Sequence, residues 1–208
     1  MTKILKPYTI IPRELYVNRD ADRQIKNIIK DMCRPGYVLV YIDLSNPFED
    51  ARSCFENVID SAVDTNYEKF AEVSKEINER RAELRNTPPH KQHIYELRQL
   101  IKSIDGKLVI ILDEIDALTK TSYSDQIFAQ IRSIYFSRIN YVELERLTYI
   151  LSGVIEPNEI IKDPKISPFN IGQKIFLNDF NKEEFTHFLV KSNLNLTAEL
   201  SKRVFYWT

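Results

Sequence analysis

The sequence predicts a three-layer α/β domain with a mostly parallel central sheet flanked by helices. Five consecutive apolar residues, Leu108 to Leu112, form the kind of uninterrupted run that is typical of a strand buried on both faces. Strand-like and helix-like segments alternate along the chain, which indicates βαβ units and parallel strand pairing. The 208 residues, 43% of them hydrophobic, suit one medium-sized globular domain with a sizeable core.

The expected helices are identified by apolar residues at helical spacing and by capping residues at their starts. Asp20 is a suitable N-cap for a helix that carries Ile25, Ile28 and Ile29 on one face. The sequence Asn-Lys-Glu-Glu, which starts at Asn181, is a capping box for the last expected helix. The other helices are expected over residues 49–64, 67–85, 92–104, 124–139 and 181–192.

Two further expected strands lie at residues 148–154 and 174–177, and residues 35–46 are harder to interpret. Residues 35–40 have the pattern of one complete strand, and residues 41–46 have the pattern of another. Adjacent parallel strands need a crossover of a dozen or more residues, and none separates Val40 from Tyr41. Either this segment is one long strand, or a phosphate-binding loop and its helix are missing between Val40 and Tyr41. We favour the second interpretation.

Two acids, Asp113 and Glu114, follow the apolar run directly, at the edge where open α/β sheets bind ligands. This is the Walker B pattern of P-loop nucleotidases. In that pattern the first acid holds Mg²⁺, and the second orients or deprotonates the attacking water. The alternative is a buried strand that simply ends in acidic loop residues, because such endings are common.

The glycine-rich phosphate loop that accompanies Walker B is missing from the sequence. No string of the form GxxxxGK[ST], whose backbone N–H groups cradle phosphates, occurs among the residues. Gly106 and Lys107 do not supply it, because Leu108 follows and the pair enters a strand instead of leaving one. We interpret this pair as a turn before the strand.

Several short motifs occur in a characteristic order along the chain, at residues 15–22, 41–45, 108–116, 147–154 and 167–172. In this order they resemble the AAA-like ATPase domain of the STAND class of P-loop signalling NTPases. The resemblance implies a nucleotide-binding domain over residues 1–180 and the start of a helical lid subdomain over residues 181–208. The chain departs from the family in its missing phosphate loop and in the lack of an arginine beside Ser152 and Gly153.

The resemblance also implies residue roles, with ATP and Mg²⁺ as cofactors. Asp113 is the expected Mg²⁺ ligand, Glu114 the catalytic base and Ser152 a sensor of the terminal phosphate. Tyr16 and Arg19 match the motif beside the nucleotide base. Each role has a structural alternative: an exposed cap for Glu114, turn chemistry for Ser152, and a surface ion pair for Arg19.

Two further acids are less clearly assigned. Asp43 lies near the end of the second strand-like run and suits either an acid near the site or a helix cap. Asp116 is expected to be an N-cap or a structural acid instead of a ligand.

The function implied by the resemblance is an ATP-binding, slowly hydrolysing regulatory switch, and an ATPase if the full chain has a phosphate loop. Its expected partners are effector or sensor domains of the same chain, partner proteins, and other copies of the chain in a nucleotide-dependent association. A non-catalytic interaction module on the same fold is one alternative. An origin-recognition-like DNA-loading ATPase is another.

Composition narrows these classes. The net charge of −1 gives no basic field and argues against nucleic acid. No apolar stretch reaches membrane-spanning length. Two cysteines, Cys33 and Cys54, form no CxxC site and no disulfide framework, so a reducing cytoplasm is expected.

His90 and His93 have no nearby third ligand, and a polar helix start explains them better than a metal site.

Overall fold

The computed structural model describes residues 24, 36–161, 163–176 and 178–206. They fall into two compact units, with the sheet and its helices up to residue 173 in one and residues 174–206 in the other. The expected helix after Asp20 lies outside the described residues, as do Tyr16 and Arg19.

Three parallel strands form the sheet of the larger unit. They are β1 (Val38–Asp43), β2 (Leu108–Asp113) and β3 (Leu147–Leu151), in the spatial order β1-β2-β3. The Walker B-like run is the central strand, and its residues Leu108, Val109 and Ile110 are fully buried. Because consecutive strand residues face opposite sides, β2 is buried on both faces, and the predicted parallel sheet is confirmed.

One strand occupies the segment where we expected two. Val40 pairs with Ile110 and Tyr41 with Ile111, so β1 continues without a break across the proposed junction. The two-strand interpretation of residues 35–46 is therefore wrong. Residues 38–43 pair with β2 without interruption, so they form one extended strand. No crossover connection lies between Val40 and Tyr41.

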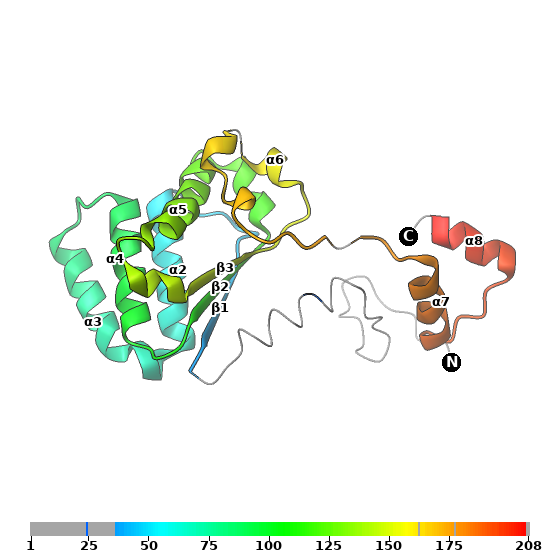
Figure 1. Cartoon of the computed structure of the whole chain (residues 1–208), viewed down its shortest axis with the longest axis horizontal. Coiled ribbons are helices and arrows are strands. Elements are labelled where there is room, and N and C mark those ends of the chain that lie inside the picture. The colour runs from blue at the N-terminus through cyan, green and yellow to red at the C-terminus, as the bar shows by residue number, and fades with distance from the viewer. Residues whose placement is uncertain (1–23, 25–35, 162, 177, 207–208) are drawn as a thin grey trace. The chain divides into compact units, whose positions relative to one another are not determined.

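The helices cover one face of β1. Its residues Val38, Val40 and Ile42 are buried and face α2 (Ala51–Thr65), whereas Leu39 and Tyr41 on the opposite face are 48% and 58% exposed. Within the part of the chain that the structure describes, the expected third layer is therefore not seen over β1. Helices flank the sheet, as Figure 1 shows, but they do not enclose β1.

Helices α3 (Tyr67–Glu83) and α4 (Pro89–Lys102) complete this side, with α4 against α2 and α3 against both. Helix α2 begins after the N-cap Asp50, whose carboxylate accepts a hydrogen bond from the Ser53 amide at 2.7 Å. Helix α4 begins three residues before the predicted start, because proline is well tolerated in the first turn of a helix.

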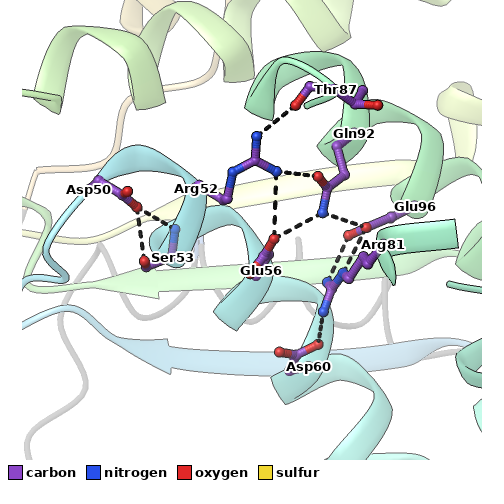
Figure 2. A network of polar contacts seen from close by, with 9 residues as sticks. All are labelled: Asp50, Arg52, Ser53, Glu56, Asp60, Arg81, Thr87, Gln92 and Glu96. Carbon is purple, nitrogen blue, oxygen red and sulfur yellow. Dashed lines mark hydrogen bonds and ion pairs between the residues drawn. The ribbon is translucent and has the colours of Figure 1, made fainter. Parts of the chain in front are cut away.

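A polar network joins these three helices (Figure 2). Arg81 of α3 donates two hydrogen bonds of 2.8 Å to the buried carboxylate of Glu96 on α4. A third N–H of Arg81 reaches Asp60 of α2 at 2.8 Å. Gln92 of α4 donates 3.0 Å hydrogen bonds to Glu96 and to Glu56 of α2. The network links the three helices, and Gln92 and Glu96 at its centre are buried.

Helix α5 (Ser124–Ser137), one of the helices that the sequence predicts, also belongs to the larger unit. Several short helical turns complete this unit. Short 3-10 turns η2 (Ile115–Lys120) and η3 (Val142–Arg146) follow β2 and precede β3. Three short helical turns follow β3: α6 (Pro157–Ile160), η4 (Pro164–Ile166) and η5 (Pro168–Asn170).

Helices α7 (Lys182–Lys191) and α8 (Ala198–Tyr206) belong to the smaller unit. The predicted capping box is confirmed, because Asn181 accepts the Glu184 amide and the Glu184 carboxylate accepts the Asn181 amide. Phe185 and Phe205 bring the two helices together, with ring centroids 5.2 Å apart. The strand expected at 174–177 is not formed, since residues 174–176 have no strand pairing.

Candidate functional site at the carboxyl edge of the sheet

The carboxyl ends of all three strands meet at one edge of the sheet. Asp43 of β1 is the register partner of Asp113 of β2. Ser152 follows β3, and its amide donates to the carbonyl of Leu112 at 2.9 Å. The Ser152 carbonyl in turn accepts the Ile115 amide at 3.0 Å. The fold therefore brings together three polar residues that are far apart in sequence, two of them predicted as site residues.

Asp113 is the most highly connected of these groups. Its Oδ2 accepts a hydrogen bond of 2.7 Å from the Tyr41 hydroxyl, and its Oδ1 accepts the Glu114 amide at 3.1 Å. Hydrogen bonds from Tyr41, and then from Ser152, hold the pKa of the Asp113 carboxyl below its usual value. The carboxylate is therefore ionised at neutral pH and correctly charged to bind a cation.

Tyr41 is a site residue that sequence reasoning missed. It pairs with Ile111, so Asp113, two residues farther along β2, is its diagonal neighbour on the same face. The alternation of Tyr41 and Asp43 along β1 signals a shared face. Nothing in the sequence, however, shows that β1 and β2 are neighbours.

Glu114 has an unusual backbone conformation. Its φ of 56° and ψ of 37° lie in the left-handed region, where it caps the start of η2. A residue with a Cβ is disfavoured there. Its side chain is exposed, and within the described part of the chain its carboxylate accepts no hydrogen bond. Glu114 thus fits both an exposed cap and a group free to orient water.

Asp116 has the structural role expected of it. Its Oδ1 accepts the Val154 amide at 3.2 Å and so links η2 to the segment after β3. Gly153 makes this approach possible, because a Cβ there would lie 2.9 Å from both Asp116 Oδ1 and Ile115 Cγ1.

Asp43 lies beside Asp113 and does not cap a helix. Its Oδ1 accepts the Ser45 amide at 2.8 Å, and hydrogen bonds from Ser45 lower its pKa. The helix-cap alternative for Asp43 is wrong, because Asp50 caps α2. Asp43 is therefore a second acid at the same edge of the sheet.

The expected cofactors fit the site only in part. Mg²⁺ commonly binds one or two carboxylates together with water and phosphate oxygens, and Asp113 with Asp43 suits that chemistry. No group of three or more His, Cys, Asp or Glu residues that could hold a metal occurs among the described residues. The described residues also offer no glycine-rich loop of N–H donors for phosphates, so we assign no phosphate contact.

His93 is a core residue. Its ring is buried, stacks on Phe55 at 4.5 Å and lies 3.3 Å from the Tyr149 hydroxyl through Nε2. Burial lowers its pKa to about 3, so the ring is neutral at physiological pH. The predicted polar helix start is wrong for His93, because its side chain belongs to the core.

Comparison with known families identifies the domain. The profile of a family described as "AAA-like domain" matches residues 53–206, which is more than half of the chain and includes Asp113, Glu114 and Ser152. The chain belongs to the AAA-like domain family. The match begins after β1, so Tyr41 and Asp43 lie outside the part of this AAA-like domain that the profile covers.

A curated relative of this AAA-like domain is an uncharacterised WD repeat-containing protein of Synechocystis sp.. The two are 37% identical over 98 residues, which cover 44% of this chain and 8% of the relative. The matched segment is therefore a small part of a much longer protein. No solved structure matches the chain. None of the described helices is long and apolar enough to cross a membrane.

Proposed function

We propose that this AAA-like domain binds ATP with Mg²⁺ at the carboxyl edge of β2 and acts as a regulatory switch of the STAND type. One observation carries the proposal: an ionised Asp113 and an exposed Glu114 end the central buried strand, at the edge where such sheets bind ligands. Membership of the AAA-like family supports the same assignment.

The proposed roles follow from the positions of the side chains. Asp113 binds the metal, with Asp43 beside it as a second negative group. Glu114 orients or deprotonates water, because its carboxylate is exposed and next to Asp113. Ser152 holds the Asp113 carboxylate through its hydroxyl. Mg²⁺, when bound, supplies positive charge that offsets the phosphates.

The regulatory part of the proposal concerns the whole protein. Slow hydrolysis suits a switch in which a bound phosphate orders neighbouring segments. The curated relative contains WD repeats in a chain of which the match covers only 8%. We therefore propose that sensor or effector modules of the same chain, or partner proteins, respond to the nucleotide, in the cytoplasm. Nucleotide-dependent self-association is part of the same proposal.

Titration of the full chain with a fluorescent ATP analogue, with Mg²⁺ or with EDTA, tests the proposal. Asp113→Ala should weaken Mg²⁺-dependent binding, and Glu114→Gln should keep nucleotide but slow hydrolysis. Asp105→Ala is a matched control, because Asp105 is an exposed acid at the opposite end of β2. Equal turnover by wild type and Glu114→Gln would refute the assigned base. Equal loss of binding in Asp105→Ala would refute the site.

A non-catalytic interaction module is the second candidate, and two observations favour it. The sequence has no GxxxxGK[ST] string. In addition, the Asp113 carboxylate is already satisfied by Tyr41, Ser152 and the Glu114 amide. This candidate predicts no Mg²⁺-dependent binding of the analogue even at millimolar concentration, so the same titration separates the two functions.

A further inference from the structure

A groove runs along the exposed face of α5, away from the candidate nucleotide site. Its volume is about 460 Å³, within the range of ligand-binding sites. One stripe of α5 and the turn η4 line it, and this α5 groove is defined here by Ala129, Arg132, Ser133, Phe136, Asn140 and Lys165.

Two cations in the α5 groove have no carboxylate partner within the described residues. Arg132 Nη1 donates to the Ser167 carbonyl at 3.0 Å and to Asn170 Oδ1 at 2.8 Å, and both acceptors are neutral. Lys165 is exposed, and none of the ion pairs among the described residues includes it. The nearest acid in sequence, Asp163, accepts the Lys165 backbone amide at 2.9 Å, so it offsets only part of the positive charge.

The guanidinium of Arg132 has N–H donors available to bind an anion. It lies over the ring of Phe136, 4.8 Å from the centroid, while its two hydrogen bonds use Nη1 only. A guanidinium carries five N–H donors, so the Nε and Nη2 donors remain available. A planar fork of this kind matches the two oxygens of a carboxylate.

An apolar surface adjoins these charges. Phe136 is 47% exposed, and Ile139 and Val142 just beyond the end of α5 are 88% and 71% exposed. Ala129 adds a small apolar wall at the other end of the groove. A ligand of the α5 groove therefore meets an aromatic face next to two positive charges.

We propose that the α5 groove binds an acidic segment of a protein partner. A Glu or Asp carboxylate of the segment pairs with Arg132 and Lys165, and a neighbouring apolar side chain packs on Phe136. Charge complementarity selects the acid, and the exposed aromatic ring selects an apolar neighbour beside it.

The dimensions of the groove favour a peptide over a small anion. Residues 129 to 137 of α5 span roughly 12 Å along the helix, the length of about three to four extended residues. Ser133 and Asn140 add polar side chains that can hydrogen-bond a peptide backbone. Two cations in a chain of net charge −1 are too few for a nucleic-acid surface. The proposal does not depend on ATP binding.

Fluorescence anisotropy with the full chain tests the proposal. The probe is a labelled peptide with alternating Glu and Leu residues, and its matched control has Gln in place of every Glu. We expect binding of the Glu peptide that weakens as salt rises, and binding of the Gln peptide that is weaker by about threefold to tenfold. Lys165→Gln should reduce affinity for the Glu peptide by a similar factor.

Two more variants keep the test decisive. Ser133→Trp should block the exposed groove without removing a charge, whereas Arg132→Gln also loses the contacts to residues 167 and 170 and so is not used alone. Lys69→Gln, which removes an exposed cation from α3, should bind like wild type. Equal affinity for the Glu and Gln peptides, or full binding by Ser133→Trp, would overturn the proposal. So would competition of equal strength by inorganic phosphate or by single-stranded DNA.

Discussion

The Tyr41 hydroxyl donates a 2.7 Å hydrogen bond to Oδ2 of Asp113, across two neighbouring parallel strands. The bond has opposite effects on the two groups. It stabilises the Asp113 carboxylate and so lowers its pKa, and it raises the pKa of Tyr41 because the phenol is the donor. The hydrogen bond depends on a charged Asp113, so its contribution to stability can be measured as a function of pH.

Tyr41→Phe should destabilise the protein in a pH-dependent manner. Because the folded-state pKa of Asp113 is lowered, its stabilising contribution is present above the unfolded pKa and is lost as pH falls through the folded value. The difference in urea midpoint between wild type and variant should therefore be largest near pH 7 and shrink below about pH 4. Tyr67→Phe, at an exposed tyrosine of α3, is the control and should match wild type at both pH values. A stability difference between Tyr41→Phe and wild type that does not change with pH would contradict a hydrogen bond from Tyr41 to the ionised Asp113.

Glu114→Gly should stabilise the fold while removing the proposed base. The left-handed backbone at Glu114 is unfavourable for a residue with a Cβ, so glycine should raise the free energy of unfolding by about 0.5–1 kcal/mol. Glu114→Gln keeps the Cβ and should leave stability unchanged. Asn193→Gly is a matched control, because Asn193 has a φ of 54° but asparagine tolerates this region, and its gain should be smaller. Thermal or urea unfolding measures these changes. A lower free energy of unfolding for Glu114→Gly than for wild type would contradict an unfavourable backbone conformation at Glu114.

Arg81→Ala should be strongly destabilising, because it leaves the Glu96 carboxylate buried without its cation. The Glu96 side chain is 2% exposed, and loss of one partner of a buried pair costs about 3–5 kcal/mol. Glu72→Ala is the comparison: it removes a surface pair with Lys75, in which Glu72 is 90% exposed. That change should cost at most about 0.5 kcal/mol. Urea denaturation measures both, and similar costs for the two would show that the Arg81 network of Figure 2 contributes little.

His93 should make stability fall with acidification. Burial lowers its folded-state pKa to about 3, whereas the unfolded chain binds a proton near pH 6.5. Between these values the unfolded state holds more protons, so stability is lost as pH falls, by at most about 1.4 kcal/mol per pH unit. His93→Phe keeps an aromatic ring against Phe55 and should flatten the slope between pH 4 and 6.5. His90→Gln, at an exposed histidine, should keep the wild-type slope.

Local features were predictable where a short stretch of sequence sets the structure. The Asn181 capping box formed as expected, because its partners are three residues apart. The run from Leu108 to Leu112 was correctly assigned to the buried core, since an apolar run of that length can be satisfied only there. Residues 35–46 were misinterpreted, because their residue pattern suggested two strands whereas pairing with β2 defines one.

The sequence by itself determined which residues are apolar, where the acids follow a strand and where the capping box starts α7, because these depend on neighbours along the chain. Only the tertiary structure decided that Tyr41 holds Asp113 and that Gly106 packs against Gly36, where an added Cβ would lie 2.2 Å from the Gly36 carbonyl oxygen. Both contacts depend on β1 lying beside β2 in one register. Hydrogen bonds between segments about 70 residues apart fix that register, and no local pattern encodes them.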